Sequence, residues 1–379
     1  FAREEPQEDQ KTWRTWRTRT WREDLEEQTC RTRRTWRTRR PEEAEHLEDI
    51  AARDVGETSG CRRNDANMPE EDGYKHDHQR WLADFKEAGD GKSNADMSKI
   101  RPLRHKIWRQ TEHNIQKMKS KESGFSSTKC IKSTGKQLRH DGLNSRSSPI
   151  EPVNAGQVAP ALRVEVIDGD LLEHAAELCR KQNLKVAVLN MASPNKPGGG
   201  VRNGAGAQEE TMFRRSDLAN FLDESKFYPI HDESCLVSPD VTILRGKEQD
   251  GYPFLEEGDR YLVTFLTCPA PERPKLTGRS YEPESEKRMR AQIRALIAGA
   301  EDAHCDVCIF SAFGCGAFGN PPEEVARLFK EELQQSSLAQ VTFCILNDHN
   351  SFGRHNPNGN FAPFKDAFRD HMTEPLAAP

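Results

Sequence analysis

From Leu162 onward, strand-like apolar runs alternate with amphipathic helical stretches, and this alternation constrains the fold more than any other feature. The predicted strands span residues 162–168, 184–193, 240–246, 260–271, 306–313 and 340–348, and the predicted helices span 170–182, 286–304 and 321–337. Alternation of this kind is typical of an α/β fold with a mixed, mostly parallel sheet covered by helices on both faces. The continuous apolar run at 184–193 indicates a strand buried on both faces, and Asp170 is the predicted N-cap of the first of these helices.

The composition divides the chain in two. Residues 1–150 hold 32 basic and 27 acidic side chains, whereas 151–379 hold 24 and 34, a balance of −10. All six tryptophans lie within the first 108 residues. We therefore predict a disordered, low-complexity region at 1–100 and one folded unit at 101–379, with a helical extension at 101–150 and a core at 160–372.

Several classes of protein are excluded or disfavoured. No apolar run is long enough to cross a membrane, and the first ten residues lack the apolar region of a secretory signal. The ten cysteines are irregularly spaced, and Cys305 and Cys308 have no second pair with which to form a zinc ribbon. The 12 histidines are scattered. We expect structural thiols, no metal, no cofactor, no membrane partner and an intracellular location, cytoplasmic and/or nuclear.

Residues 11–40 carry an imperfect Thr-Trp-Arg repeat. Arginines on phosphates and tryptophans stacked on bases would suit nucleic-acid binding, and Arg31–Arg40 would suit a nuclear-localisation patch. Low-complexity sequence with too little apolar surface to order the chain is the interpretation we favour. Further along, the spacing of apolar residues predicts one helix within 103–120, followed by a polar loop to about residue 148.

Two glycine-rich loops follow buried strands, at 190–200 and 311–320. Ligands of open α/β sheets bind beyond the carboxyl ends of the strands, and a glycine-rich turn before a helix offers free N–H groups to a phosphate. Neither loop has the Walker A or the dinucleotide-binding spacing. Each loop alone is equally consistent with a tight turn, but two together favour a phosphate-bearing ligand.

The cluster Gln208-Glu209-Glu210 follows the first loop. Adjacent glutamates point in different directions, so they do not flank one scissile bond as a standard glycosidase pair does. One glutamate at the reacting bond with its neighbour orienting a sugar is the functional interpretation. A pair of charges at a helix N-terminus is the structural alternative.

The stretch VAVLNMASPNKPGGG-VRNGAGA-QEE closely resembles the signature of the microbial-type poly(ADP-ribose) glycohydrolases, a catalytic branch of the macrodomain fold. The segments FYPIHDESCLVSPDVTILRG, LVTFLTCPAP, FSAFGCGAFGNPPEEVARLF and VTFCILND follow in the order of that family, and the resemblance covers about residues 103–372. It implies a macrodomain-like three-layer α/β/α sandwich that binds the terminal ADP-ribose of a poly(ADP-ribose) chain.

The same resemblance implies roles for single residues. Glu210 is the expected catalytic residue, and Glu209 is expected to hold the distal ribose hydroxyls. An acidic residue after the first strand, Asp168 or Asp170, is expected to contact adenine, and spacing alone does not choose between them. The other expected ligand contacts are Asn190, Asn195, Gly198, Gly199, Gly200, Gln208, Gly314, Cys315, Gly316, Ala317, Phe318 and Gly319.

These residues suit hydrolysis of ribose–ribose O-glycosidic bonds, with Glu210 donating a proton to the departing oxygen and then activating water. A non-catalytic ADP-ribose-binding module and a hydrolase of mono-ADP-ribosylated protein are the alternatives. Expected partners are poly(ADP-ribose) and poly(ADP-ribosyl)ated proteins, with ADP-ribose as the product. We expect a monomer whose folded domain does not bind nucleic acid directly.

The charge of residues 151–379 bears on how the polymer is recognised. A balance of −10 disfavours long-range attraction of a polyanion, so we expect recognition of a chain terminus within one or two ADP-ribose units. Residues 101–150 hold 12 Lys and Arg against 3 Asp and Glu. The sequence does not place them relative to the cleft, and it assigns no role to Arg202 and Asn203 between GGG and QEE.

Overall fold

The computed structural model describes residues 76–91, 95–119, 128–133, 137–138, 162–347 and 351–369. All of them belong to one compact unit, Tyr74–Pro379. The Thr-Trp-Arg repeat, and most of the region predicted to be disordered, lie outside the described residues.

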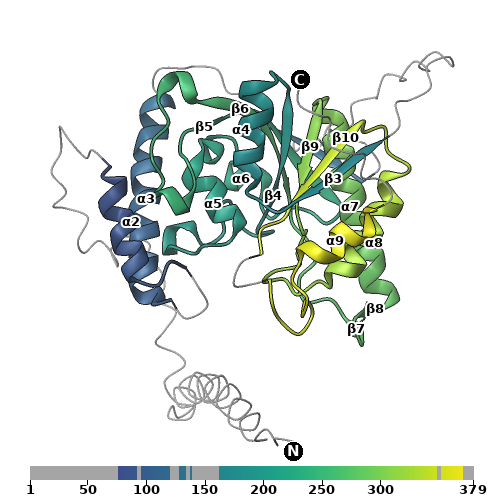
Figure 1. Cartoon of the computed structure of the whole chain (residues 1–379). Helices are drawn as coiled ribbons and strands as arrows, with labels where there is room; N and C mark the ends of the chain where they lie inside the picture. Colours follow the sequence, from purple (N-terminus) through teal and green to yellow (C-terminus); the bar gives the residue numbers. More distant parts are fainter. Residues whose placement is uncertain are drawn as a thin grey trace, which may run out of the picture. The chain divides into compact units, whose positions relative to one another are not determined.

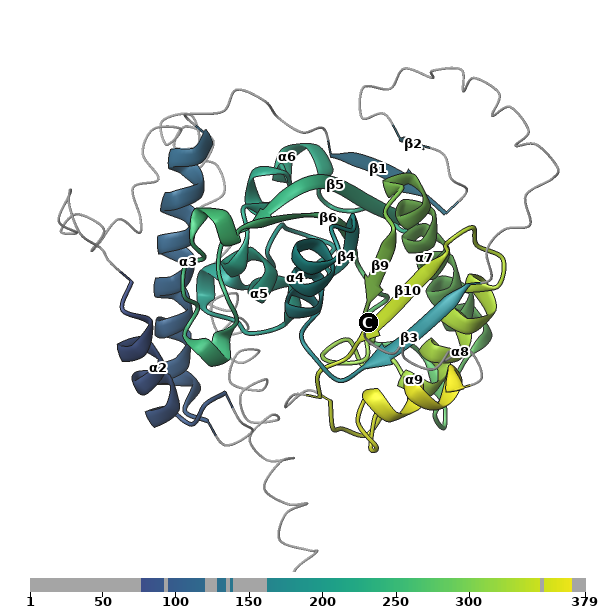
Figure 2. The same ribbon diagram turned by 45° about the horizontal axis from the view of Figure 1, so that its top comes forward.

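The described strands form an eight-stranded sheet in the order β2-β1-β5-β6-β4-β9-β10-β3 (Figures 1 and 2). The strands are β1 Lys129–Lys132, β2 Gln137–Leu138, β3 Arg163–Ile167, β4 Val186–Met191, β5 Ser234–Ile243, β6 Tyr261–Cys268, β9 Val307–Phe310 and β10 Gln340–Cys344. Neighbours from β6 to β3 are parallel, whereas β5 is antiparallel to both β6 and β1. The predicted mixed, mostly parallel sheet is thus confirmed. A separate hairpin joins β7 Leu276–Thr277 to β8 Ser280–Tyr281.

Helices cover both faces of the sheet (Figures 1 and 2). On one face lie α7 Pro283–Ala303, α8 Pro322–Leu333 and α9 Phe361–Ala367, and on the other lie α4 Leu171–Lys181, α5 Gln208–Arg215 and α3 Met97–Lys119. The shorter helical elements are α6 Glu224–Phe227, η2 Val201–Asn203, η3 Leu218–Asn220, η4 Glu248–Asp250 and η5 Glu257–Asp259. The three-layer α/β/α arrangement is confirmed.

The central strand β4 shows why the sheet needs both helical layers. Ala187 and Leu189 pack in the core beneath α7 and α8, while Val186 and Val188 pack in the core beneath α4 and α5. Because side chains alternate across a strand, a run of apolar residues is buried on both faces. At the head of α4, the Asp170 carboxylate accepts hydrogen bonds from the N–H groups of Leu172 and Glu173, which confirms the predicted N-cap.

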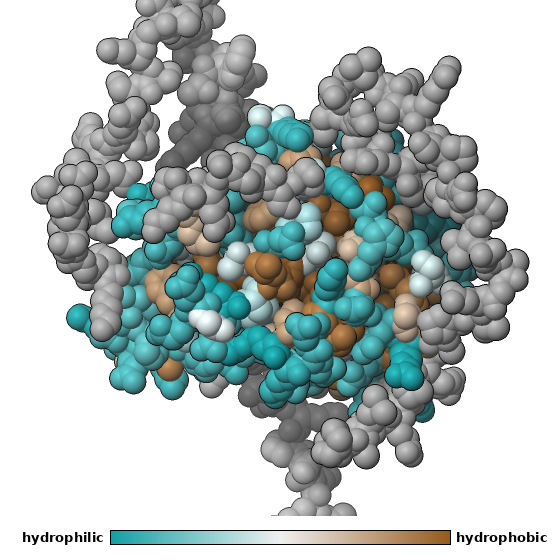
Figure 3. Space-filling view, turned by 90° about the horizontal axis from the view of Figure 1, so that it is seen from above, coloured by the Kyte–Doolittle hydropathy of each residue, from teal (hydrophilic) through white to brown (hydrophobic). Residues whose placement is uncertain are grey.

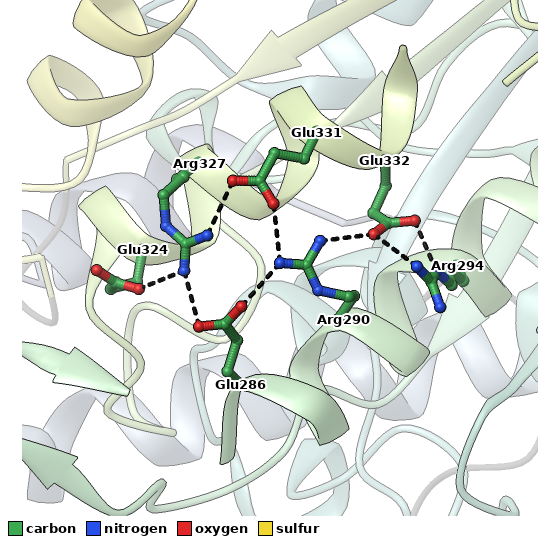
Figure 4. A network of polar contacts seen from close by, with 7 residues as sticks. All are labelled: Glu286, Arg290, Arg294, Glu324, Arg327, Glu331 and Glu332. Carbon is green, nitrogen blue, oxygen red and sulfur yellow. Dashed lines mark hydrogen bonds and ion pairs between the residues drawn. The ribbon is translucent and has the colours of Figure 1, made fainter. Parts of the chain in front are cut away.

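Ion pairs join α7 to α8 (Figure 4). Arg290 contacts Glu286 on its own helix and Glu331 and Glu332 on α8, at 2.7–2.8 Å. Arg294 also reaches Glu332, whose side chain is only 4% exposed. Networks stabilise more than isolated surface pairs because each side chain is ordered once for several contacts.

The predicted boundary near residue 100 is wrong. The helix α2 His78–Glu87 buries Trp81 and Phe85, which form a small core with Ile100 and Ile107 of α3 and with Tyr252. Local composition did not reveal this core, because Tyr252 lies more than 150 residues away in the sequence. Folded structure therefore begins ahead of α3, and the helix predicted within 103–120 is the larger part of α3.

The polar loop predicted up to residue 148 also needs correction. Within it, β1 pairs with β5 from Lys129 opposite Val237 to Lys132 opposite Ser234. A four-residue strand carries too little pattern to be recognised alone, and its pairing depends on β5 about a hundred residues later.

The surface of the described part is mixed in character. Figure 3 shows apolar side chains in the centre of the face seen from above, with hydrophilic ones around them. Among the described residues, no helix is both long and apolar enough to cross a membrane.

Candidate active site

The two glycine-rich loops lie side by side because β4 and β9 are parallel neighbours. The first loop follows β4 and the second follows β9, so both leave the carboxyl edge of the sheet. This edge is where open α/β sheets bind ligands.

The Gln208 side chain joins the start of α5 to the end of β4 through two hydrogen bonds. Its Oε1 accepts a hydrogen bond from Met191 N at 2.8 Å, and its Nε2 donates to the Leu189 carbonyl at 2.6 Å. Sequence reasoning predicted Gln208 as a ligand contact. The structure instead uses both ends of the amide on the main chain of β4, which fixes where Glu209 and Glu210 lie.

Glu209 is held by the loop that precedes it. The side chain is buried, with Oε2 accepting from Ser193 N at 2.7 Å and Oε1 accepting from Gly198 N at 3.1 Å. Burial, assisted by the charge of Glu210, raises the pKa of Glu209 to about 8, although the two N–H groups oppose the rise. Glu209 is therefore mostly protonated at neutral pH and can donate a hydrogen bond as well as accept one.

Glu210 is also buried, but only half of its carboxyl group is engaged. Its Oε1 accepts a hydrogen bond from Gly200 N at 2.8 Å. Its Oε2 is buried and has no hydrogen-bond partner among the described residues. An unpartnered buried carboxyl oxygen is costly unless a ligand uses it.

Gly199 shows why this loop needs glycine. Its φ is +50°, and a Cβ there would lie 2.8 Å from Glu210 Oε1 and 2.9 Å from Glu209 Oε2. Any larger residue would displace both carboxyl groups. At Gly198, a Cβ would meet the Phe213 ring of α5 at 2.7 Å.

The second loop presents its main chain. The N–H groups of Gly316, Ala317 and Phe318 donate to no group in the described part of the chain, whereas Cys315, Gly319 and Asn320 donate within or beside the loop. Consecutive free N–H groups form a nest suited to a phosphate. Burial raises the pKa of the Cys315 thiol, so Cys315 remains a thiol and lines the loop only through its main chain. Phe318 is half-buried against the core.

Asn320 holds this loop in shape, a role that the sequence did not reveal. Its buried side-chain amide donates to the carbonyls of Pro271, at 2.8 Å, and Gly314, at 3.1 Å. Its Oδ1 accepts from the Tyr281 hydroxyl at 2.9 Å. The asparagine immediately after the glycine cluster was the available signal.

The sequence did not decide whether Asp168 or Asp170 contacts a ligand, and the structure places these two aspartates in different surroundings. Arg215 donates two hydrogen bonds to the Asp170 carboxylate, at 2.8 and 2.9 Å, in addition to the capping bonds. Although burial opposes it, the Arg215 charge holds the pKa of Asp170 below its usual value. Asp168 is exposed. The Asp170 carboxylate therefore caps α4 and pairs with Arg215 of α5, whereas the Asp168 side chain is accessible to a ligand.

Asn190 and Asn195 lie in different surroundings. Asn190 is buried, with Nδ2 donating to Thr267 Oγ1 at 3.3 Å and Oδ1 unpartnered among the described residues. Asn195 is exposed on the first loop. Sequence reasoning also missed Tyr228, whose buried hydroxyl has no described partner. Burial first, and then the charge of Glu209, raise its pKa, which places the phenol near that carboxyl group.

Comparison with known proteins shows what this chain is similar to. Residues 104–246 match the family model "Microbial-type PARG, catalytic domain". The structure is similar to that of poly(ADP-ribose) glycohydrolase from Thermomonospora curvata, at 26% identity and a TM-score of 0.54, covering 72% of this chain and 100% of that one. The inhibitor-bound structure of the same bacterial enzyme matches at 24% identity and a TM-score of 0.53, with coverage of 71% and 100%.

A poly(ADP-ribose) glycohydrolase from Deinococcus radiodurans, in complex with ADP-ribose, matches at 27% identity and a TM-score of 0.46, covering 56% of this chain and 86% of that one. The chain matches none of the curated proteins. The matched segment 104–246 contains both the GGG loop and the QEE cluster whose geometry is described above. Residues 104–246 of this chain are therefore similar to the catalytic domain of the microbial-type poly(ADP-ribose) glycohydrolases.

Proposed function

We propose that this chain hydrolyses the ribose–ribose O-glycosidic bonds of poly(ADP-ribose) and releases ADP-ribose from chain termini. The observation that carries the proposal is the arrangement of Glu210. One of its oxygens is fixed by Gly200 N, and the other is buried with no partner among the described residues. A general acid needs this combination of a fixed orientation and a free oxygen.

The bond to be broken joins the anomeric carbon of the terminal ribose to an oxygen of the preceding ribose. Glu210 donates its proton from Oε2 to that oxygen as the carbon–oxygen bond breaks, and the electron pair leaves with the oxygen. The anomeric carbon acquires oxocarbenium character. The Glu210 carboxylate then removes a proton from the water that attacks this carbon, which restores the acid. Positioned acid–base catalysis contributes about 10²–10⁴-fold in rate.

The remaining residues bind the ADP-ribose unit in this proposal. Glu209 and the Oδ1 of Asn190 orient the terminal ribose hydroxyls, and the N–H groups of 316–318 hold the diphosphate. Neither this oxygen nor these N–H groups have a hydrogen-bond partner among the described residues. Asp168, which is exposed while Asp170 is occupied by Arg215, contacts adenine. A macrodomain-type binding mode for one terminal unit fits these positions.

Labelled poly(ADP-ribose) tests the proposal. We expect the full chain to release free ADP-ribose from the first time point, while the longest polymers shorten gradually. Binding without release would indicate a reader module and contradict the enzyme. Release from mono-ADP-ribosylated protein, with the polymer left intact, would favour the alternative hydrolase.

A further inference from the structure

The helix α3 borders the segment that leads to the catalytic glutamates. Gly204 and Gly206 lie directly against it, since a Cβ at Gly204 would fall 2.1 Å from the Arg101 carbonyl and one at Gly206 would fall 2.0 Å from Arg104 Nη1. The α3 helix therefore packs on the turn η2 and the start of α5. Arg101 and Arg104 of α3 thus lie against the segment that leads to Glu209 and Glu210, a placement that the sequence left open.

Arg202, in η2, is held in place on this border. Its Nη1 lies 3.0 Å from Glu112 Oε1, and its guanidinium carbon lies 5.9 Å from the centre of the buried Trp108 ring. The side chain is nevertheless 71% exposed, so the cation is oriented by α3 while its outer surface faces solvent. Arg202 follows by two residues the Gly200 whose N–H fixes Glu210, which is a span of no more than about 7 Å along the chain.

Arg202 has cationic neighbours on the same flank of α3. Arg101 and Arg109 are exposed. At about 100° per residue, Arg101, Arg109 and Glu112 fall within an arc of about 80°, and the two arginines are about 12 Å apart along the helix. Glu112 also lies 3.5 Å from Arg109. We define the cationic patch as Arg101, Arg109 and Arg202, with Glu112 as the acidic residue paired with two of them.

The positions of the loops and helices along the carboxyl edge of the sheet indicate what the cationic patch can bind. The N–H groups at 316–318, which have no partner in the described part of the chain, follow β9, whereas α3 lies on the other side of α5 and β4 (Figures 1 and 2). If the terminal diphosphate lies over the loop after β9, the leaving side of the scissile bond points away from it, toward η2 and α3. Resting on the proposed function, we infer that the cationic patch binds the diphosphate of the penultimate ADP-ribose unit.

This inference explains how cationic side chains of α3 and η2 offset the acidic balance of residues 151–379 when the chain engages a polyanion. The patch places three guanidinium groups and one carboxylate along α3 and η2, whereas residues 151–379 as a whole carry a charge of −10. Arginine is suited to this role because its planar fork binds phosphate oxygens in pairs. The binding footprint is then two units, one on each side of Glu210.

The test compares two substrates. The first is poly(ADP-ribose), and the second is ADP-ribose carrying a 4-nitrophenoxy group at the anomeric carbon of its terminal ribose, which lacks a penultimate diphosphate. Arg202→Ala should lower kcat/KM roughly 3- to 10-fold more for the polymer than for the nitrophenyl substrate. It should also reduce the slope of log KM for the polymer against log salt concentration by about 0.7, the loss of one phosphate contact on a single-stranded polyanion. The matched control is Arg163→Ala, at the opposite edge of the sheet, which should change neither quantity.

A second variant keeps the proposal falsifiable if Arg202→Ala disturbs the turn. Glu112→Gln removes the negative charge beside two arginines, so it should lower KM for the polymer and steepen the salt slope. A rise in polymer KM with Glu112→Gln, or an equal loss on both substrates with Arg202→Ala, would overturn the inference. Failure of the wild-type chain to act on either substrate would instead contradict the proposed function.

Discussion

Gly200 donates its N–H to Glu210 Oε1 at 2.8 Å, and this bond orients a carboxyl group whose second oxygen is unpartnered in the described structure. The donor belongs to the glycine loop after β4, and the acceptor belongs to the first turn of α5. The Gln208 amide fastens the same turn to β4. The position of the proposed acid therefore depends on a short main-chain loop, and the following predictions examine that dependence.

Gly199→Ala should abolish most of the activity. The added Cβ would lie under 3 Å from one oxygen of each glutamate, in a backbone conformation that disfavours alanine. A displacement of about 1 Å at a reacting group costs on the order of 10²-fold in rate. Initial rates of ADP-ribose release measure the effect. The matched control is Gly258→Ala, where a Cβ would meet nothing within 4 Å. Equal rates for the two variants would contradict the proposed role of the loop.

The raised pKa of Glu209 predicts a pH dependence of stability. The folded chain keeps this proton up to about pH 8, whereas the unfolded chain loses it near the ordinary value of 4.5. Between these values the native state binds more protons, so this group makes the free energy of unfolding fall as pH rises. In urea unfolding at several pH values, the free energy of unfolding should fall less steeply with rising pH for Glu209→Gln than for the wild type. An unchanged decline would show that Glu209 is not protonated when folded.

Asn320→Ala should weaken ADP-ribose binding and destabilise the fold. Three hydrogen bonds of its buried side chain hold the second loop, and the loss of one buried partner costs about 1–3 kcal/mol. Calorimetric titration with ADP-ribose and thermal unfolding measure the two effects. The exposed Asn358 provides the control variant, Asn358→Ala. If Asn320→Ala binds ADP-ribose as tightly as the control, the loop does not hold the diphosphate.

The ion-pair network of α7 and α8 should affect stability without affecting catalysis. Glu332 contacts both Arg290 and Arg294 and is nearly buried, so Glu332→Gln should lower the free energy of unfolding by about 1 kcal/mol. The loss should shrink in high salt, because salt screens the exposed part of the network. Unfolding at two salt concentrations tests this, with activity at low temperature expected to be unchanged. A large loss of activity in Glu332→Gln, under conditions where the variant is fully folded, would contradict a purely structural role for Glu332.

The sequence predicted well what depends on local pattern. The strands β4 and β9 were evident from unbroken apolar runs, the Asp170 cap from its place before a helical period, and the two loops from their glycines. The adjacency of Glu209 and Glu210 to the glycine loop was also predictable, since all of them lie within thirteen residues.

What the sequence did not show depends on distant pairings. The core that begins at Trp81 is completed by Tyr252, and β1 becomes a strand only through β5. The ion pair of Asp170 depends on Arg215, which is 45 residues further along the chain. The orientation of Arg202 depends on Glu112, and no local pattern connects these two residues.

The most direct test of the central claim is ADP-ribose release from labelled poly(ADP-ribose) by Glu210→Gln beside Glu284→Gln, a variant of an exposed glutamate on α7. The amide keeps an acceptor for Gly200 N but cannot donate and regain a proton as an acid. We expect release by Glu210→Gln to fall about 10²–10⁴-fold, with its affinity for ADP-ribose within a few-fold of the wild type, while Glu284→Gln releases ADP-ribose at the wild-type rate. Release by Glu210→Gln at the rate of Glu284→Gln would contradict the assignment of Glu210 as the general acid.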